Sequence, residues 1–495
     1  MKKILVANRG EIAVRVLRSA KEMGIKTIAV FSEADRHSPH VLMADEAVCI
    51  GPPPSSESYL LGEKIIEVAL NLNADGIHPG YGFLSENHVF AKSVKEAGIK
   101  FIGPSPSSIE TMGNKLMAKK TVADYGIPMV PGTEEALKNT DEALDIASSI
   151  GFPLLIKAAA GGGGKGMRVV HEKESLENEL ERAINEARSA FGDSSVFIEK
   201  YIQNPRHIEV QVLADMHGKV IHLFERECSI QRRHQKLIEE APSVIIDDEL
   251  RNKLGECAVN VARACNYTGA GTVEFIMDED KSFYFLEMNT RLQVEHPVTE
   301  MITGIDLVKE QIKIADGLKL EYDQADLNIT GHAIELRVCA EDPLNNFLPE
   351  TGKLDLYKTP QGPGVRVDEG LYEGMEIPIY YDPMIAKLIV HSSDRKSAID
   401  KMKRAISEYH INGVSTTLDF GHFVMENQAF IDGDFNTHFI DKHFKPKMLL
   451  NNINEEEALV AGIAAVVLHN KNTNTSNYTE SKTVPQNTWY KNRKS

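Results

Sequence analysis

The sequence predicts an α/β protein with some α+β elements, and three observations carry that prediction. Near the N-terminus, short apolar strand patterns alternate with amphipathic helical patterns, as in βαβ units. Farther along, a strand ending at Lys157 runs into the glycine-rich stretch Gly161–Gly166. Two apolar strand patterns then flank the polar turn Asp278–Ser282, as in a β-hairpin. With 495 residues, 42% of them hydrophobic, the chain can form about three domains.

The first domain is expected to contain a parallel sheet. Ile4–Ala7 and Thr27–Phe31 are strand patterns, and the apolar period over Ile12–Ala20 predicts a helix between them. The alternation recurs along the next segment, so we expect a Rossmann-like arrangement. The turn Asn8–Gly10 has one glycine where a dinucleotide fingerprint needs three, which argues against an NAD site. The turn-rich loop His78–Asn87 follows a strand end, where open α/β sheets place ligands.

The second region opens with a helix that carries Lys115, Lys119 and Lys120, and we interpret the last two as a solvated face. The glycine-rich stretch then lies between the strand patterns Leu154–Ile156 and Met167–Val170. Consecutive glycines let backbone N–H groups wrap phosphate oxygens. The stretch lacks the Ser or Thr that ends a Walker A loop. A flexible linker is the alternative, but the flanking strands favour a hairpin lid over phosphates.

Two charge-rich strand patterns follow. Arg206–Val212 alternates strictly between polar and apolar residues. Three polar side chains share one of its faces: His207, Glu209 and Gln211. Glu225–Lys236 packs an unusual density of charge around a short apolar break. A charge run is usually a solvated face, but this one also fits an anion-binding wall on which His234 and Lys236 face the hairpin.

The hairpin within residues 269–300 carries the densest set of reactive side chains. If its turn is centred between Asp280 and Lys281, Glu274 lies opposite Glu287 and both point to one face. Alternation places these residues on the same face: Glu287, Asn289, Arg291, Gln293 and Glu295. The companion residues are apolar on both faces, as in a central strand, which disfavours a merely solvated polar face.

Residue type indicates the chemistry of that face. Glu274, Glu287 and Asn289 supply only oxygen ligands, which suit Mg²⁺ or Mn²⁺ bridging nucleotide phosphates. Arg291 offers a planar fork that matches an oxyanion such as bicarbonate or phosphate. Glu295 is the nearest candidate general base. The hairpin therefore predicts a metal–ATP site beside an anionic co-substrate.

The C-terminal third begins with the alternating strand pattern His332–Val338. Arg337 lies inside it, and the residues alone leave open whether Arg337 is a surface charge or a ligand for an anion. A final helix is predicted at Ser397–Tyr409, and an apolar helix at Glu455–Leu468. The remaining residues are rich in Asn, Thr, Ser and Lys, as flexible tails are.

Charge and composition disfavour several classes of protein. A net charge of −17 and a pI near 5.5 argue against a nucleic-acid partner. No apolar run approaches the length of a membrane span, so no membrane partner is expected. The N-terminal residues match a first strand and not a signal peptide. Five cysteines without CxxC spacing are typical of reduced thiols, and we expect a cytoplasmic protein.

Several separated motifs together identify a family. Over roughly residues 1–445 the chain resembles the biotin carboxylases, the ATP-grasp components of biotin-dependent carboxylases. The glycine-rich loop and LEMNTR are also similar to motifs of carbamoyl phosphate synthetases, but the runs RRHQKLIEEAP and RLQVEHPVTE are more specific. The other motifs that carry the resemblance are KILVANRGEIAVRV, HPGYGFLSEN, MGNK, FPLLIKAAAGGGGKGMRVV, EKYIQNPRHIEVQV, GAGTVEF and YYDPMIAKLI.

The resemblance implies an order of domains. A Rossmann-like biotin carboxylase N-terminal domain is expected at 1–114, and an ATP-grasp domain at 115–330 with its glycine-rich lid at about 131–203. A mixed α/β biotin carboxylase C-terminal domain is expected at 331–445, followed by a partner-docking helix and flexible tail at 446–495.

The resemblance also implies a role for individual residues. Those matching the family's nucleotide contacts are Lys115, Lys157, His207, Gln231 and His234, with Gly163 and Gly164 in the phosphate lid and Glu199, Lys200 and Ile202 around the adenine. Thr437 stands where an aliphatic adenine contact is common, which puts nucleotide affinity in doubt. The residues matching the bicarbonate pocket are Lys236, Arg291, Gln293 and Val294. Glu295 matches the general base, and Arg337 the residue that stabilises the biotin enolate. Glu274, Glu287 and Asn289 match the metal ligands.

The activity implied by the resemblance is ATP-dependent carboxylation of biotin by bicarbonate through carboxyphosphate, with two Mg²⁺ or Mn²⁺ ions per site. The chain has no Ala-Met-Lys-Met signature of a biotinyl domain, so biotin is expected on a separate carrier protein. A separate carboxyltransferase and a homodimer are implied as well. The C-terminal tail resembles propionyl-CoA-type α chains, which favours an acetyl-CoA or propionyl-CoA carboxylase.

Two other functions compete with this one. An ATP-grasp ligase that joins a carboxylate to an amine would need neither Arg337 nor a bicarbonate wall. A catalytically silent ATP-binding scaffold should have lost a metal ligand or the base, yet Glu274, Glu287, Asn289 and Glu295 are all present.

Overall fold

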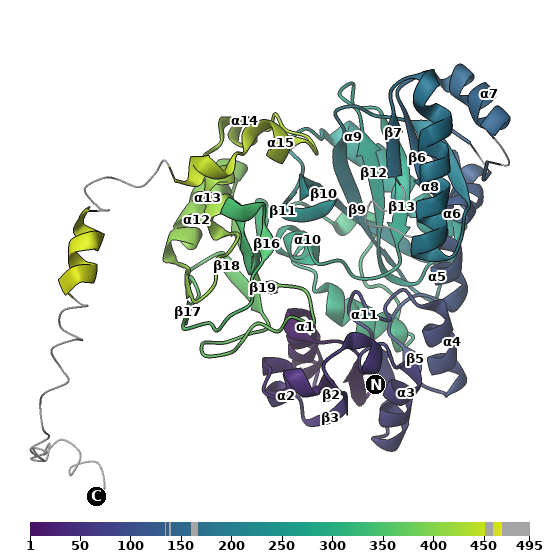
Figure 1. The fold of residues 1–495 in the computed structure, drawn as a ribbon. Coiled ribbons are helices and arrows are strands. Elements are labelled where there is room, and N and C mark those ends of the chain that lie inside the picture. Colours follow the sequence, from purple (N-terminus) through teal and green to yellow (C-terminus); the bar gives the residue numbers. More distant parts are fainter. Residues whose placement is uncertain (134, 138–139, 160–166, 451–458, 468–495) are drawn as a thin grey trace, which may run out of the picture. The chain divides into compact units, whose positions relative to one another are not determined.

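The computed structural model describes residues 1–133, 135–137, 140–159, 167–450 and 459–467 (Figure 1). The chain forms two units, Met1–Lys445 and Pro446–Ser495. In the second unit residues 459–467 are helical, and the rest of the helix expected at 455–468 lies outside the described residues. Within the described ranges, no helix is both long and apolar enough to cross a bilayer.

The first unit begins with the expected parallel sheet. Its strand order is β3-β2-β1-β4-β5, with neighbours parallel. The strands are β1 (Lys3–Val6), β2 (Lys26–Ser32), β3 (Glu46–Gly51), β4 (Gly76–His78) and β5 (Lys100–Phe101). The helices that follow or connect them are α1 (Gly10–Glu22), α2 (Pro39–Met43), α3 (Gly62–Asn71), α4 (His88–Glu96), α5 (Pro106–Gly113) and α6 (Lys115–Ala123). Sequence analysis missed β3, whose residues are mostly half-buried and show no clean apolar run.

Helix α1 shows why these segments fold as they do. Ile12, Val16, Leu17 and Ala20 recur at helical spacing and are all buried in one core beneath the sheet. Lys21 stands in the last turn, where its positive charge suits the helix dipole. The chain then leaves the helix through Gly24, whose φ of +72° favours glycine.

A small three-stranded sheet precedes the main one. Its order is β7-β6-β8, and both pairs are antiparallel. Its elements are α7 (Thr140–Ile150), β6 (Leu154–Ala158), β7 (Met167–Val170), α8 (Leu176–Phe191) and β8 (Val196–Lys200). The antiparallel β6–β7 pair confirms the predicted hairpin, whereas its glycine-rich loop, with Gly163 and Gly164, lies outside the described residues.

The main sheet has eight strands in the order β13-β12-β9-β10-β11-β14-β19-β18. All its neighbours are antiparallel. Its strands are β9 (Arg206–Ala214), β10 (Val220–Arg232), β11 (Gln235–Ala241), β12 (Gly269–Met277), β13 (Phe283–Asn289), β14 (His332–Cys339), β18 (Val365–Glu369) and β19 (Met384–Ser392). The helices that pack against it include α9 (Asp248–Ala264), α10 (His296–Thr303) and α11 (Leu307–Ala315).

This sheet crosses the domain boundary expected at residue 330. Strand β11 precedes that boundary and β14 follows it, yet the two pair directly from Ile238↔Leu336 to Ala241↔Ala333. The ladder continues into β19 and β18. The central and C-terminal parts of this unit therefore share one hydrogen-bonded sheet.

The C-terminal part contains more helices than the sequence indicated. The helix predicted at Ser397–Tyr409 is confirmed as α12 (Arg395–Glu408), but it is not the last one. The further elements are α13 (Leu418–Glu426), α14 (Gln428–Asp432) and α15 (Phe439–His443), and the short strands β15 (Glu341–Asp342), β16 (Leu348–Pro349), β17 (Leu356–Lys358) and β20 (His410–Asn412). These three helices contain at most nine residues, which is too few for the apolar period to stand out.

Candidate active site

The β12–β13 hairpin has the predicted register at its functional end. Glu274 pairs with Glu287 and Thr272 with Asn289, so the two carboxylates lie side by side on adjacent strands. A bulge then shifts the register between Glu274 and Phe275.

The polar face extends beyond the strand in a different way from the prediction. Strand β13 ends at Asn289, so strand alternation does not govern Arg291, Gln293 or Glu295. These residues lie in the segment that leads into α10, and Glu295 occupies the residue before the helix begins. Their side chains nevertheless line the same cavity as Glu274. The predicted grouping is correct, although a loop produces it.

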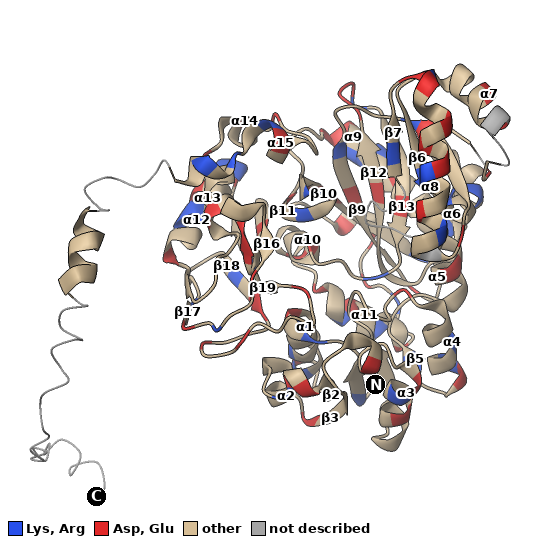
Figure 2. Cartoon of the chain, in the orientation of Figure 1, with Lys and Arg blue, Asp and Glu red and all other residues tan. Residues whose placement is uncertain are grey.

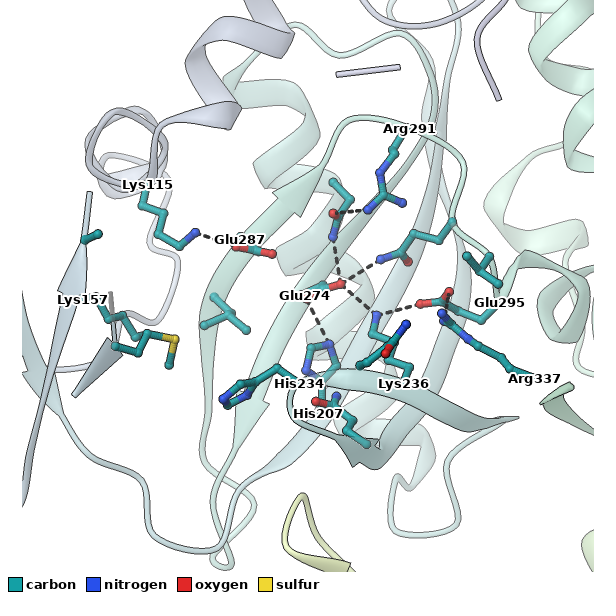
Figure 3. A pocket seen from close by; sticks show the side chains of 18 residues that line it. Lys115, Lys157, His207, His234, Lys236, Glu274, Glu287, Arg291, Glu295 and Arg337 are labelled. Atoms are coloured by element: carbon teal, nitrogen blue, oxygen red, sulfur yellow. Dashed lines mark hydrogen bonds and ion pairs between the residues drawn. The ribbon is translucent and has the colours of Figure 1, made fainter. Parts of the chain in front are cut away.

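Lys236, near the start of β11, lies at the centre of this cavity (Figure 3). Its Nζ donates to Glu274 Oε1 at 2.9 Å and to Glu295 Oε1 at 2.7 Å, and it also pairs with Glu209. Glu274 lies on β12, three strands away from β11 in the sheet order. The contact shows that the sheet curls and that its concave side forms the site.

The charges of this cluster are strongly coupled. Burial alone would lower the pKa of Lys236, but the three carboxylates outweigh burial and raise that pKa well above its usual value. Burial would raise the pKa of Glu295, but Lys236, Arg337 and Arg226 hold it well below. The pKa of Glu274 is lowered in the same way by Lys236 and His207. Lys236 is therefore a cation and both glutamates are carboxylates near neutral pH.

Arg337 joins the cluster from the next strand, β14. Its Nε donates to Glu239 Oε1 at 2.7 Å, and its second guanidinium nitrogen donates to Glu295 Oε2 at 2.9 Å. Glu295 thus bridges Lys236 and Arg337. Arg337 pairs with two carboxylates, lines the cavity and has only 12% of its side chain exposed, which rules out the surface charge that the sequence had left open.

The first half of the charge run, Glu225–Ile230, is buried and is not a solvated face, whereas Arg233, His234 and Gln235 at the turn are exposed. Arg226 is 0% exposed, and its guanidinium donates to Glu209, Gln211, Thr272, Gln293 and Thr299. It therefore ties β9, β10 and β12 to the segment carrying Glu295. Figure 2 shows that both signs of charge also occupy outer helices such as α8, so charge density alone could not separate the two environments.

The side of the cavity lined by α6 and β6 carries further lysines. Lys115, at the start of α6, lies 3.1 Å from Glu287 Oε2. Lys157, at the end of β6, pairs with Glu199, as does Lys119. The interpretation of Lys119 as a solvated charge was wrong, because this side chain is largely buried and its ammonium lies over the Phe197 ring. Its apolar neighbours come from β8, which the sequence of α6 alone does not reveal.

The cavity has a volume of about 320 Å³, and Figure 3 shows its side chains converging from several strands. Of the residues singled out from the sequence, it brings together Lys115, Lys157, His207, Gln231, His234, Lys236, Glu274, Glu287, Asn289, Arg291, Gln293, Val294, Glu295 and Arg337. A second cavity of about 480 Å³ shares Lys236, Arg291, Val294 and Arg337 with it. That cavity also contains Asn8, Arg9, Tyr81 and Tyr381 from the loops beside the N-terminal sheet and the C-terminal part.

Family models match almost the whole first unit. Residues 1–109 match the biotin carboxylase N-terminal domain, and residues 335–442 match the biotin carboxylase C-terminal domain. Residues 114–323 match the ATP-binding domain of the carbamoyl-phosphate synthase L chain. The chain belongs to the biotin carboxylase family.

Named relatives and solved structures agree with this assignment. The chain is 52% identical to biotin carboxylase 1 of Bacillus subtilis over 90% of this chain and 99% of that one. It is 56% identical to a pyruvate carboxylase chain of Methanothermobacter thermautotrophicus, over 89% and 90% of the two chains. The biotin carboxylase domain of Hydrogenobacter thermophilus 2-oxoglutarate carboxylase superposes with a TM-score of 0.87 at 49% identity, covering 90% and 98%. That domain was solved as a dimer with MgADP, ADP and bicarbonate.

Four residues that the family resemblance associated with adenine do not line the cavity of this biotin carboxylase. Glu199 is engaged by Lys119 and Lys157, and Lys200 Nζ donates to the carbonyls of Gly151 and Phe152. Ile202 is buried, and the Thr437 amide donates to Pro205 O.

Conversely, the residues that sequence reasoning missed at the cavity wall are Ala158, Met167, Gln235 and Leu286. The bulge in the hairpin accounts for Leu286, because strict alternation from Glu287 would place the neighbouring residue Leu286 on the opposite face.

The donor set of the biotin carboxylase cavity fits a hard divalent cation. Glu274 and Glu287 are cross-strand neighbours, and Asn289 follows two residues later on β13. All three supply oxygen, as Mg²⁺ and Mn²⁺ prefer. In the structure, these oxygens accept instead from cationic or amide groups: Glu274 from Lys236, Gln293 and Asn289, and Asn289 from Arg291. Positive partners therefore already converge on each candidate ligand.

Proposed function

We propose that this chain catalyses the ATP-dependent carboxylation of biotin by bicarbonate, through carboxyphosphate, with the biotin carried on a separate protein. The observation that carries the proposal is the bridge formed by Glu295, which contacts Lys236 on one side and Arg337 on the other. One carboxylate thereby links Lys236, the residue proposed to act on the phosphate, to Arg337, the residue proposed to act on biotin. The family membership and the bicarbonate-bound relative support the same reaction.

The nucleotide would occupy the first cavity. Lys115 and Lys157 approach it from α6 and β6, and His207, Gln231 and His234 line it from the main sheet. Glu274, Glu287 and Asn289 would hold the divalent cations, which supply charge neutralisation for phosphoryl transfer. From the family pattern we also propose that Gly163 and Gly164 contact the phosphates. We likewise propose that the adenine is held by Glu199, Lys200, Ile202 and Thr437.

Bicarbonate would bind between Arg291 and the Lys236 cluster, near Gln293 and Val294. The Arg291 guanidinium donates to Glu86 and to Asn289, so its fork is held in place before any anion arrives. The ionised Glu295 would accept the bicarbonate proton, and the bicarbonate oxygen would then attack the γ-phosphate of ATP. Lys236 would offset the charge that develops on the transferring group.

The second half of the reaction would use Arg337. Carboxyphosphate breaks down to CO₂ and phosphate, and the phosphate takes the N1′ proton of biotin. Arg337 stabilises the resulting enolate while N1′ captures CO₂ to give N-carboxybiotin. The second cavity supports this order, because it reaches Arg337 and Lys236 from the side of Tyr81 and Tyr381.

We propose the domain boundaries of the sequence analysis: 1–114, 115–330 with a lid at about 131–203, 331–445 and 446–495. The limits of the family models support these boundaries within a few residues. The unit boundary between Lys445 and Pro446 supports the last of them.

We further propose a carrier protein, a carboxyltransferase and a second copy of this chain as partners. The five free cysteine thiols support a reducing, cytoplasmic location. We propose that the complex to which this chain contributes is an acetyl-CoA or propionyl-CoA carboxylase. Propionyl-CoA carboxylase α chain of Sus scrofa is 51% identical over 92% of this chain, whereas the Methanothermobacter pyruvate carboxylase chain is 56% identical. Identity alone therefore does not select the acceptor.

The test is bicarbonate-dependent ATP hydrolysis by the purified chain, with and without free biotin. Biotin should stimulate hydrolysis, and both Glu295→Ala and Arg337→Ala should abolish the stimulation. The controls Arg404→Ala and Glu408→Ala break an ion pair on an exposed face of α12 and should change nothing. Turnover indifferent to biotin would instead indicate an ATP-grasp carboxylate–amine ligase, and ATP binding without turnover would indicate a scaffold.

A further inference from the structure

Two glutamates face each other behind Arg337. Glu239 on β11 and Glu335 on β14 are register partners, so their side chains project from the same face of the sheet. Both are 0% exposed. Opposed carboxylates in a protein interior cannot both stay ionised without strong repulsion.

The pair is incompletely hydrogen-bonded among the described residues. Glu239 Oε1 accepts from Arg337, but Glu239 Oε2 and both carboxyl oxygens of Glu335 have no hydrogen-bond partner there. An unpartnered, fully buried carboxylate is costly, whereas a protonated carboxyl can donate to an oxygen of its neighbour. The Glu239 oxygen left without a donor is available as that acceptor.

The surrounding cations are largely committed elsewhere. Lys387, which lies opposite Arg337 on β19, donates to Val294 O at 2.9 Å and lies 3.3 Å from Glu11 and 3.8 Å from Asp368. Lys236 is shared by Glu209, Glu274 and Glu295. His296, on the helix packed over these strands, has a pKa held well below its usual value by burial and by Lys387, so it adds no charge. Arg337 is the cation that hydrogen-bonds to the pair, through Glu239 Oε1.

Burial raises the pKa of Glu335 well above its usual value, against the opposing pull of Lys387, and Glu239 adds to the increase. Burial likewise raises the pKa of Glu239 to about 7, although Arg337 lowers it. Both shifts run in the direction that repulsion and burial together require.

We propose that Glu239 and Glu335 hold one proton between them, so that the pair presents a single negative charge to Arg337 and Glu335 serves as a positioning residue. This inference rests on the proposed function of Arg337 in biotin carboxylation. With both glutamates ionised, Arg337 would face three carboxylates, counting Glu295, and would be drawn away from a biotin enolate. With one shared proton, its charge stays available towards the cavity.

The first test needs no turnover. Infrared spectra of the full chain at pH 8 are compared between the natural sequence and Glu335→Gln. The difference should contain the carbonyl band of a protonated carboxylic acid that the variant lacks. Loss of carboxylate bands alone would show that Glu335 is ionised and would overturn the proposal. This measurement shows whether the Glu239–Glu335 pair holds a proton, and it does so independently of turnover. An absence of any effect of biotin on ATP hydrolysis would instead overturn the proposed function.

The second test compares two substitutions of similar size. Glu335→Gln can still donate to Glu239 and should keep biotin-stimulated ATP hydrolysis within about twofold near pH 8. Glu335→Leu cannot donate and should reduce the stimulated rate at least about tenfold, because a hydrogen bond to a charged group is lost. Biotin-independent hydrolysis should change far less in both. Equal behaviour of Gln and Leu, whether both active or both inactive, would overturn the proposal.

The pH profile gives a readout that packing alone would not move. Above the pH at which the pair loses its shared proton, the natural chain should lose biotin stimulation, whereas Glu335→Gln should retain it, since a glutamine cannot ionise. Glu227→Gln serves as the matched control. Glu227 is equally buried, on β10, and bonds Ser229, Ser243 and Arg206 without touching Arg337. An unshifted alkaline limb in Glu335→Gln would refute the shared proton.

Discussion

Replacing Lys236 with methionine would remove a cation shared by three buried carboxylates while keeping most of the side-chain volume. The Nζ atom lies 2.9 Å from Glu274 and 2.7 Å from Glu295, and it also contacts Glu209. At an effective dielectric constant of about 20, each contact is a gross attraction of about 6 kcal/mol. Arg226 and Arg337 remain to compensate Glu209 and Glu295. The net cost should therefore be that of breaking a buried ion pair, about 3–5 kcal/mol of unfolding free energy.

This cost should depend on pH in a defined direction. The pKa of Glu295 and that of Glu274 are held low in the folded chain, partly by Lys236. A carboxyl with a lowered pKa stabilises the fold above its unfolded pKa and loses that contribution as pH falls through the folded one. The unfolded pKa of a glutamate is about 4.3, so the Lys236→Met destabilisation should be larger at pH 6 than at pH 3.

Two assays check these expectations. Chemical denaturation at both pH values measures the free energy of unfolding, and bicarbonate-dependent ATP hydrolysis should fall by about 10²–10³, the loss expected for a charge that stabilises the transition state. Lys253→Met is the control, because Lys253 pairs with Glu249 on the exposed face of α9. Retention of hydrolysis within about twofold in folded Lys236→Met would refute the assignment of Lys236 to phosphoryl transfer.

Three further predictions concern other parts of the molecule. Glu274→Gln removes a proposed metal ligand, so the Mg²⁺ concentration for half-maximal ATP hydrolysis should rise at least about tenfold in a Mg²⁺ titration. Burial raises the pKa of Glu11 to about 7, so the natural chain should lose about 3 kcal/mol of unfolding free energy relative to Glu11→Gln between pH 4.5 and 8, as measured by denaturation. Lys119→Met removes one of two lysines on Glu199 and should raise the KM for ATP several-fold, whereas Lys120→Met, on the exposed side of α6, should not.

For each of these three predictions, one result would contradict the reasoning. An unchanged Mg²⁺ requirement in Glu274→Gln would remove that residue from the ligand set. Parallel stability curves for the natural chain and Glu11→Gln would mean that Glu11 is ionised in the fold, paired with Lys387. Equal KM values for ATP in the two lysine variants would mean that the Lys119–Glu199 contact stabilises the fold but does not affect ATP binding.

The sequence predicted the chemistry of the site better than its geometry. The predicted pairing of Glu274 with Glu287 is correct, but the turn alone does not produce it. The pairs next to the turn are centred on Asp280, and the bulge between Glu274 and Phe275 supplies the one-residue shift that brings the two glutamates opposite each other. Arg291, Gln293 and Glu295 reached the same cavity through a loop that alternation does not describe.

Contacts between distant strands could not be predicted in this way. The Lys236–Glu274 contact depends on the curl of the main sheet, and the burial of Lys119 depends on β8 packing over α6. Burial of Arg226 depends on four polar partners besides Glu209, from segments as far apart as β9 and α10. Charge density in the sequence does not distinguish such a residue from a surface arginine.

The pairing of β11 with β14 has a consequence for how this chain can be divided or recombined. A fragment ending at residue 330 would keep β11 but lose the strand beside it, leaving the polar backbone edge at Ile238–Ala241 open. Such an edge invites association with other chains, so the ATP-binding half is not a module that can be excised intact. Chimeras between relatives should join outside the 206–392 sheet, and in a lineage its two halves should be inherited together.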